Sequence, residues 1–342
     1  MIRRIKHAST ATCTLPIYMG FLMTEPNSIS CTQLAETYNI SHDSVNRFLE
    51  REDYTPHDLY QEAIQHIDNN KLIVSIDDTV LDKPYSQHMD LVSYFWSGKH
   101  HRSVKGINLI TLYATDQNGQ NIPINFRIYD KSEGKAKNDY FMDMLSEVLS
   151  WGAKIQFITG DSWYSSTGNL KTIRKHGIRF MFGIDCNRKV SPEKGQWFQL
   201  RLLPNFHQGQ VVWLKDFGFV QLFKTQLKEQ QRFYIVHQDE DDLLSFEGFH
   251  ELHSSHWKIE QYHRVIKQVC HIEKFQVRRS KLILNHIFSA LMAYVEIQKN
   301  QFERIFENVY RWQKKLFRPV IKNFIDDFIL DKNHLLPQRV YK

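Results

Sequence analysis

The stretch KLIVSIDDTVL, residues 71–81, decides the fold. Its apolar run LIVSI is short and rich in β-branched side chains, which is typical of a buried strand. Two aspartates, Asp77 and Asp78, follow at once, with Thr79 behind them. In open α/β sheets, side chains with a chemical role lie at the carboxyl ends of strands. The stretch therefore predicts a buried strand with an acidic site at its end.

The segments that follow alternate between strand-like and helix-like patterns. Residues 106–129 form two apolar runs around the turn DQNGQ, which predicts a β-hairpin. An amphipathic helix is expected over 137–153, a strand over 154–161 that ends on Asp161, a helix over 169–177 and a strand over 178–185. This order predicts an α/β fold with an RNase H-like mixed sheet.

Alternating apolar and polar residues between about 187 and 245 predict an antiparallel β subdomain inserted into that sheet. Helical patterns resume at residue 246 and continue to the C-terminus. The predicted organisation is a helical DNA-binding region, a first core part, the β insertion, a last core part and a helical tail, over residues 1–70, 71–186, 187–245, 246–299 and 300–342.

A helix-turn-helix is predicted within CTQLAETYNISHDSVNRFL, residues 31–49. Ala35 stands where two helices pack closest, and Asn39 stands at the turn position that requires a positive φ. Ser41 is a suitable N-cap for the second helix. That helix is expected to expose side chains that reach bases or phosphates, among them His42, Asp43, Ser44, Asn46 and Arg47. A helical hairpin in a small bundle is the alternative.

The composition is that of a basic protein, and it predicts a cytoplasmic location. The 44 Lys and Arg exceed the 38 Asp and Glu, so the net charge is +6, which suits a polyanion without requiring one. The four cysteines are scattered, and no apolar run is long enough to cross a bilayer. In a bacterial cell we expect the protein to be cytoplasmic, and associated with the nucleoid when it is bound to DNA.

Three acids from distant segments are candidates for one site: Asp77, Asp161 and Glu260, the last on a predicted helix. Phosphodiester chemistry needs a deprotonated nucleophile on one side of phosphorus and a stabilised leaving oxyanion on the other. Two divalent metal ions do both, and carboxylate ligands suit Mg²⁺ or Mn²⁺. Each acid alone is more often a turn former, an N-cap or a solvated charge. Five histidines between residues 250 and 271 lack the further ligands that a zinc site needs.

The motifs around these acids resemble the catalytic regions of bacterial insertion-sequence transposases of the DDE type. These motifs are IDDT at 76–79, GDSWY at 160–164 and WKIEQYHRVIK at 257–267. The most similar branch has a β-strand insertion and the signature Tyr-x2-Arg-x3-Glu-x6-Lys. Glu260 and Lys267 match its second half, whereas His253 and His256 stand at its Tyr and Arg positions.

The resemblance implies a transposase that cleaves transposon ends and joins the freed 3′-hydroxyl to target DNA. It implies two Mg²⁺ or Mn²⁺ ions on Asp77, Asp161 and Glu260, DNA as the partner and a homodimer in the synaptic complex. Asp77 is preferred over Asp78 because the family's ligand lies two residues before the Thr and because successive strand residues face opposite ways. The other candidate DNA-binding residues are Trp163, Tyr164, His256, Arg264 and Lys267.

The tryptophan and tyrosine, next to Asp161, are interpreted as a stacking platform for an unpaired or flipped base, with core packing as the alternative. Other functions also stay open: a non-catalytic helix-turn-helix regulator on an inactive transposase scaffold, a related RNase H-like nuclease, and a two-carboxylate glycosidase, which the DNA-binding region argues against.

Overall fold

Strand β1 (Leu72–Asp82) lies in the middle of the sheet. The computed structural model describes residues 12–25, 29–98, 100–227, 230–237 and 243–332. On one side β1 pairs in parallel with β5, and β5 pairs in parallel with β6. On the other side β1 pairs antiparallel with β3, which is flanked in turn by β2 and β4. This mixed arrangement is the RNase H-like α/β sheet that the sequence predicts.

In the described part of the chain the sheet has eleven strands. The strands besides β1 are β2 (Ser93–Ser97), β3 (Arg102–Thr115), β4 (Asn121–Ile128), β5 (Ile155–Gly160), β6 (Arg179–Ile184), β7 (Lys189–Ser191), β8 (Phe198–Gln199), β9 (Gln210–Leu214), β10 (Gly218–Leu227) and β11 (Gln230–His237).

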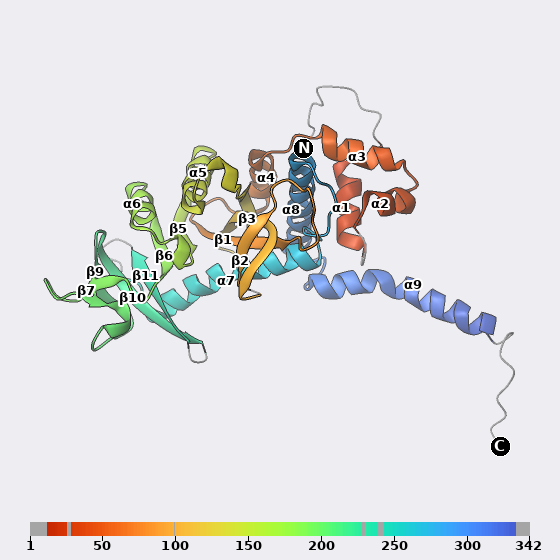
Figure 1. Cartoon of the computed structure of the whole chain (residues 1–342). Coiled ribbons are helices and arrows are strands. Elements are labelled where there is room, and N and C mark those ends of the chain that lie inside the picture. The colour runs from red at the N-terminus through yellow and green to blue at the C-terminus, as the bar shows by residue number, and fades with distance from the viewer. Residues whose placement is uncertain (1–11, 26–28, 99, 228–229, 238–242, 333–342) are drawn as a thin grey trace, which may run out of the picture.

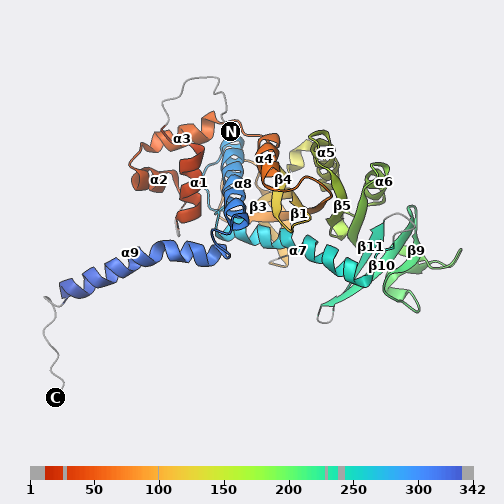
Figure 2. The same ribbon diagram turned by 180° about the vertical axis from the view of Figure 1, so that it is seen from behind.

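Helices cover both faces of the sheet. The helices are α1 (Leu15–Thr24), α2 (Cys31–Tyr38), α3 (His42–Arg51), α4 (Pro56–Ala63), α5 (Lys137–Ser150), α6 (Thr167–Lys175), α7 (Phe246–Gln268), α8 (Ser280–Phe302) and α9 (Val309–Lys332). In Figure 1, α5 and α6 lie on one face, and α7 runs along the opposite face from α8 out to β10 and β11. Figure 2 shows the same layers from behind, with α9 extending away from the body.

The β insertion continues the main sheet. Strand β11 pairs antiparallel with β6, and β10, β9, β7 and β8 follow it outward. The sequence analysis predicts an inserted antiparallel β subdomain, but the change of pattern after residue 187 gives no information on which strand the returning chain joins. The short strand β7 was not predicted. Residues 200–202 form a single 3-10 turn.

The N-terminal helices pack on the C-terminal part of the fold. Asn285 of α8 is buried and donates to the carbonyls of Leu49 and Glu52, and Tyr18 Oη shares a hydrogen bond of 2.9 Å with His286 of α8. Helix α8 therefore joins the N-terminal helices to the core. Residues 1–11 and 333–342 of the predicted end regions lie outside the described residues.

The part of the chain that the structure describes contains no helix that is both long and apolar enough to span a membrane.

Candidate active site

Asp77 and Asp161 come from neighbouring parallel strands. The parallel pairing of β1 with β5 ends at Ile76 and Gly160, so the two aspartates follow the same rung of the sheet. Gly160 is required here, because a Cβ would lie 2.6 Å from the Phe182 ring and 2.8 Å from the Ile76 side chain. Contrary to prediction, Asp77 does not end its strand, because pairing with β3 continues to Asp82. Asp77 follows only the last residue of β1 that pairs in parallel with β5.

The adjacent aspartates face opposite sides of the sheet. Asp77 lies toward α7, where its Oδ2 is 3.5 Å from Nδ1 of His263. Asp78 lies toward α5, where its Oδ2 accepts from Lys137 Nζ at 2.7 Å and from Asn108 Nδ2 at 2.6 Å. Its Oδ1 accepts from Tyr164 Oη at 2.9 Å. Three donors hold Asp78, whereas Asp77 faces the helix that carries Glu260.

Burial raises the pKa of each of the three acids, and repulsion between carboxylates adds to this effect at Asp77 and Asp161. Burial raises the pKa of Asp77 well above its ordinary value, and the charges of Asp78, Asp161 and Glu260 raise it further. Burial and the charge of Asp78 raise the pKa of Asp161 to about 6, against the opposing effect of Lys137 and two backbone N–H donors. The carboxylates of Asp77, Asp78 and Asp161 are therefore close enough to repel one another, and a bound cation would relieve that repulsion.

Glu260 lies on helix α7, and its charge is one of those that raise the pKa of Asp77. Loss of hydration raises the pKa of Glu260, and the charges of Arg232 and Arg264 lower it. Hydrogen bonds connect α7 to the two strands that precede the aspartates. Ser75 Oγ and Thr159 Oγ1 share a hydrogen bond of 2.8 Å between β1 and β5, and Thr159 is 3.2 Å from Nδ1 of His256 on α7.

These acids suit a divalent metal in donor type and in charge. Carboxylate oxygens are the ligands that Mg²⁺ and Mn²⁺ prefer, and a cation would relieve the repulsion that raises the pKa values. Among the described residues no three His, Cys, Asp or Glu side chains form a closed metal-binding cluster. Repulsion between ionised carboxylates opposes such a cluster when no cation is bound.

The comparisons with known proteins identify the family. Residues 68–295, more than half of the chain, match the model of the transposase DDE domain. This chain belongs to the DDE transposase family. No curated protein matches. One solved structure with a detectable likeness is the Argonaute of Marinitoga piezophila in complex with 5′-OH guide RNA and target DNA, at 10% identity and a TM-score of 0.22. The match covers 68% of this chain and 33% of the Argonaute chain, so the transposase spans a third of that protein, and no conclusion rests on the likeness.

The two histidines of the transposase that replace the signature Tyr and Arg are uncharged. Burial and the neighbouring His253 lower the pKa of His256 to about 4, and burial also lowers the pKa of His253. At neutral pH, His256 therefore lacks the positive charge of the arginine that the family signature has at this position. A DNA contact by His256 stays a prediction, limited to donation by a neutral ring.

The two basic residues of α7 have different surroundings. Lys267 Nζ donates to the carbonyl of Val80 in β1 at 2.6 Å and lies 3.9 Å from Glu273. Arg264 is exposed and lines a hollow with Lys258 and Tyr310. Lys267 is therefore tied to the strand that carries Asp77, while Arg264 faces solvent. Their predicted contacts with DNA phosphate remain predictions.

The predicted stacking pair separates in the structure. Trp163 has 62% of its surface exposed, and Lys137 Nζ lies 5.5 Å from the centre of its ring system. Tyr164 is completely buried against Phe141, and its hydroxyl donates to Asp78. The prediction that Tyr164 stacks on a base is wrong, because the short 3-10 turn after Asp161 directs it into the core. Trp163 remains available for stacking.

The helix-turn-helix forms as α2 and α3. Asn39 has a left-handed backbone with φ 51°, and Ser41 caps α3 by accepting from Asp43 N. Arg47 is exposed and Asn46 partly so. Ser44, expected on the exposed face, is buried, and its hydroxyl accepts from the backbone N–H of Thr12 and Cys13. The other candidate recognition side chains, His42, Asp43, Asn46 and Arg47, are exposed or partly exposed.

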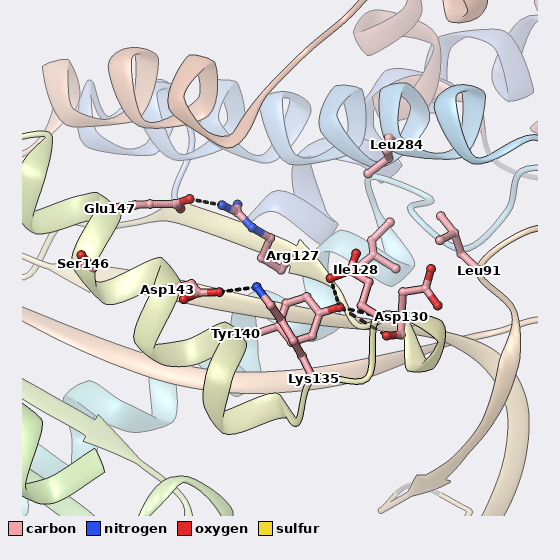
Figure 3. Close-up of a pocket in the computed structure, with 11 residues that line it drawn as sticks. Leu91, Arg127, Ile128, Asp130, Lys135, Tyr140, Asp143, Ser146, Glu147 and Leu284 are labelled. Carbon is pink, nitrogen blue, oxygen red and sulfur yellow. Dashed lines mark hydrogen bonds and ion pairs between the residues drawn. The ribbon is translucent and has the colours of Figure 1, made fainter. Parts of the chain in front are cut away.

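A hollow of about 550 Å³ lies beside β4 and α5, away from the acids (Figure 3). Two ion pairs lie in its lining: Arg127 with Glu147, and Lys135 with Asp143 at 2.8 Å. Tyr140 donates to Glu133 at 2.7 Å. The lining of this hollow includes none of Asp77, Asp161 and Glu260.

Two residues near the acids were missed by the sequence analysis. Lys137 begins α5 and reaches Asp78, and Arg232 of β11 acts on Glu260. A basic residue at the first turn of a helix gives no sequence signal of a distant carboxylate. The alternation of β11 does place Arg232 and Tyr234 on one face, but only the pairing with β6 brings that face to α7.

Proposed function

We propose that this protein is a DNA transposase that cleaves transposon ends in a metal-dependent reaction and transfers the 3′-hydroxyl into target DNA. The proposal is supported by Asp77 and Asp161, which follow the same rung of neighbouring parallel strands, and by the charge of Glu260 acting on Asp77, in a chain of the DDE transposase family. Burial and neighbouring carboxylates raise the pKa of both Asp77 and Asp161.

Asp77, Asp161 and Glu260 would hold two Mg²⁺ or Mn²⁺ ions. Bound there, the ions supply an activated oxygen nucleophile and stabilise the leaving oxyanion. The protein's own contribution would be to present these three carboxylates, and the bound cations would favour their ionised form. Asp78 takes no part in this, because Lys137, Asn108 and Tyr164 already occupy its oxygens.

DNA recognition is proposed for helix α3, through Asn46 and Arg47. An exposed helix face with an amide and a guanidinium suits the major groove, where such groups read base edges. Trp163, exposed next to Asp161, is proposed to stack on a base that is unpaired near the cut. Lys267, Arg264 and His256 are proposed to contact the DNA backbone near Glu260.

We also propose a homodimer in the synaptic complex. Helix α9 leaves the body of the molecule with apolar side chains exposed, including Leu316, Val320 and Ile321. The spacing of these residues places them on neighbouring turns of the helix. A face of this kind is suited to packing against a second copy.

The proposal is tested with the Asp161→Asn and Glu260→Gln variants on a duplex that carries the DNA bordering the gene. Each variant should lose strand cleavage while binding the duplex as the wild type does, since the acids hold metal and α3 holds DNA. Appreciable cleavage by either variant contradicts the assignment. Binding without cleavage by the wild type would indicate a non-catalytic regulator instead.

A further inference from the structure

Helix α7 lacks the arginine that the family signature places four residues before the glutamate. His256 occupies that position, with Nδ1 3.2 Å from Thr159 Oγ1 and a pKa lowered to about 4. It is therefore neutral and engaged with the sheet. A transposase site that handles a phosphodiester still needs a cation on the phosphate side, because carboxylates and phosphate repel each other.

Strand β11 presents a tyrosine and an arginine to the same part of α7. Tyr234 Oη lies 3.0 Å from Nε2 of His253, and the two rings meet edge to face with centroids 5.0 Å apart. Tyr234 and Arg232 are two residues apart in a strand, so their side chains lie on the same face of the sheet. The family signature has a tyrosine at position 253, where this chain has a histidine. In this chain, Tyr234 of β11 brings a tyrosine hydroxyl next to that position.

The register of β11 places Arg232 at the edge that carries the acids. Tyr234 pairs with Gly183, where an added Cβ would lie 3.0 Å from the backbone N of Ser162 and 3.4 Å from the carbonyl carbon of Asp161. Phe233 pairs with Ile184, the last residue of β6. Arg232 therefore projects beyond the end of β6, on the side where β5 delivers Asp161.

The surroundings of Arg232 leave its guanidinium available. The residue is exposed, and among the described residues it has no hydrogen bond or ion pair with another side chain. Its positive charge acts on both Glu260 and His253. A guanidinium is planar and offers several donors, which suits bidentate contact with a phosphate group. A guanidinium is also more weakly hydrated than an ammonium group, which lowers the cost of displacing water when it binds a phosphate.

We propose that Arg232 of β11 binds a backbone phosphate of the DNA beside Glu260, in place of the arginine that the family signature has at position 256. Tyr234 positions His253 on the same face. The identity of the ligand, a DNA phosphate, rests on the proposed transposase function. The position of the binding group rests on the arrangement of β11 and α7.

The test compares Arg232→Ala and Arg232→Lys with a control, Arg201→Ala. Arg201 is an exposed arginine that follows β8, at the far edge of the insertion. The affinity for a fluorescent 30-base-pair duplex is measured by anisotropy in EDTA over a range of KCl concentrations. The slope of log Kd against log salt should fall by about 1 for Arg232→Ala, because one phosphate contact is lost, and stay unchanged for the other two.

Single-turnover cleavage of the gene-bordering duplex in Mg²⁺ is measured on the same proteins. Loss of a hydrogen-bonded charge corresponds to about tenfold or more, so Arg232→Ala should cleave at least that much more slowly and Arg201→Ala at the wild-type rate. A wild-type slope for Arg232→Ala, with an unchanged melting temperature, overturns the proposal. A wild type that binds but never cleaves contradicts the transposase function, while the slopes still decide whether Arg232 contacts phosphate.

Discussion

Replacing each of the two adjacent aspartates should separate catalysis from stability. Asp77→Asn is expected to abolish cleavage and to leave the fold as stable as before or more stable. The reason is that Asp77 is a buried acid whose ionisation is opposed by Asp78, Asp161 and Glu260. Removing its charge relieves that repulsion and removes a metal ligand at the same time.

Asp78→Asn should have the opposite pattern. Its carboxylate is 17% exposed, as is its partner Lys137, and it accepts from Asn108 and Tyr164 as well. A hydrogen bond to a charged group contributes about 1.5–3 kcal/mol, and the amide retains part of the network, so a loss of about 2 kcal/mol is expected. With an unfolding entropy of about 2.1 cal/mol/K per residue, the melting temperature should fall by about 3 °C in a chain of this length.

The assay combines thermal unfolding in EDTA at pH 7 with single-turnover cleavage in Mg²⁺. We expect Asp77→Asn to melt at or above the wild-type temperature and to be inactive, and Asp78→Asn to melt lower and keep measurable cleavage. An inactive Asp78→Asn beside an active Asp77→Asn would refute the assignment of the two acids. Wild-type melting of Asp78→Asn would refute the structural role given to its three contacts.

Three other predictions concern metal, recognition and pH. EDTA should abolish cleavage and Mg²⁺ or Mn²⁺ should restore it, while a zinc-selective chelator has no effect; full activity in EDTA contradicts the two-metal proposal. Asn46→Ala and Arg47→Ala should weaken binding to the gene-bordering duplex more than to random DNA in gel shifts, and equal losses would mean that α3 does not read sequence. Because the pKa of Asp161 is raised to about 6 in the fold, its ionisation destabilises the metal-free protein as pH rises from about 4 to about 6. The melting temperature of Asp161→Asn relative to wild type should therefore rise over that interval, and a constant difference would contradict the raised pKa.

Local patterns were enough to predict the elements that carry the acids. The β-branched run before Asp77, the hairpin around residues 116–120 and the amphipathic helix over α5 each depend on periodicity within one segment. The turn at Asn39 depends on backbone preference at a single residue. These signals fix the order of elements, and the order of elements constrains the topology of an α/β sheet.

Contacts between distant segments could not be predicted in this way. Whether Tyr164 faces a base or the core depends on Phe141 and Asp78, which lie on other elements. The burial of Ser44 depends on the backbone N–H groups of residues 12 and 13. Likewise, the position of Arg232 depends on the pairing of β11 with β6. The residue types of β11 do not predict which strand it pairs with.

The most direct test of the central claim is a strand-transfer assay with the purified wild-type protein. A duplex ending in the DNA that borders the gene, with its 3′-hydroxyl exposed, is incubated with Mg²⁺ and a supercoiled plasmid, and joined products are separated on a denaturing gel. We predict a covalent junction between the duplex 3′ end and plasmid DNA, absent with Glu260→Gln. Hydrolysed or nicked DNA with no junction, from a wild type that binds the duplex, would contradict a transposase and indicate a nuclease.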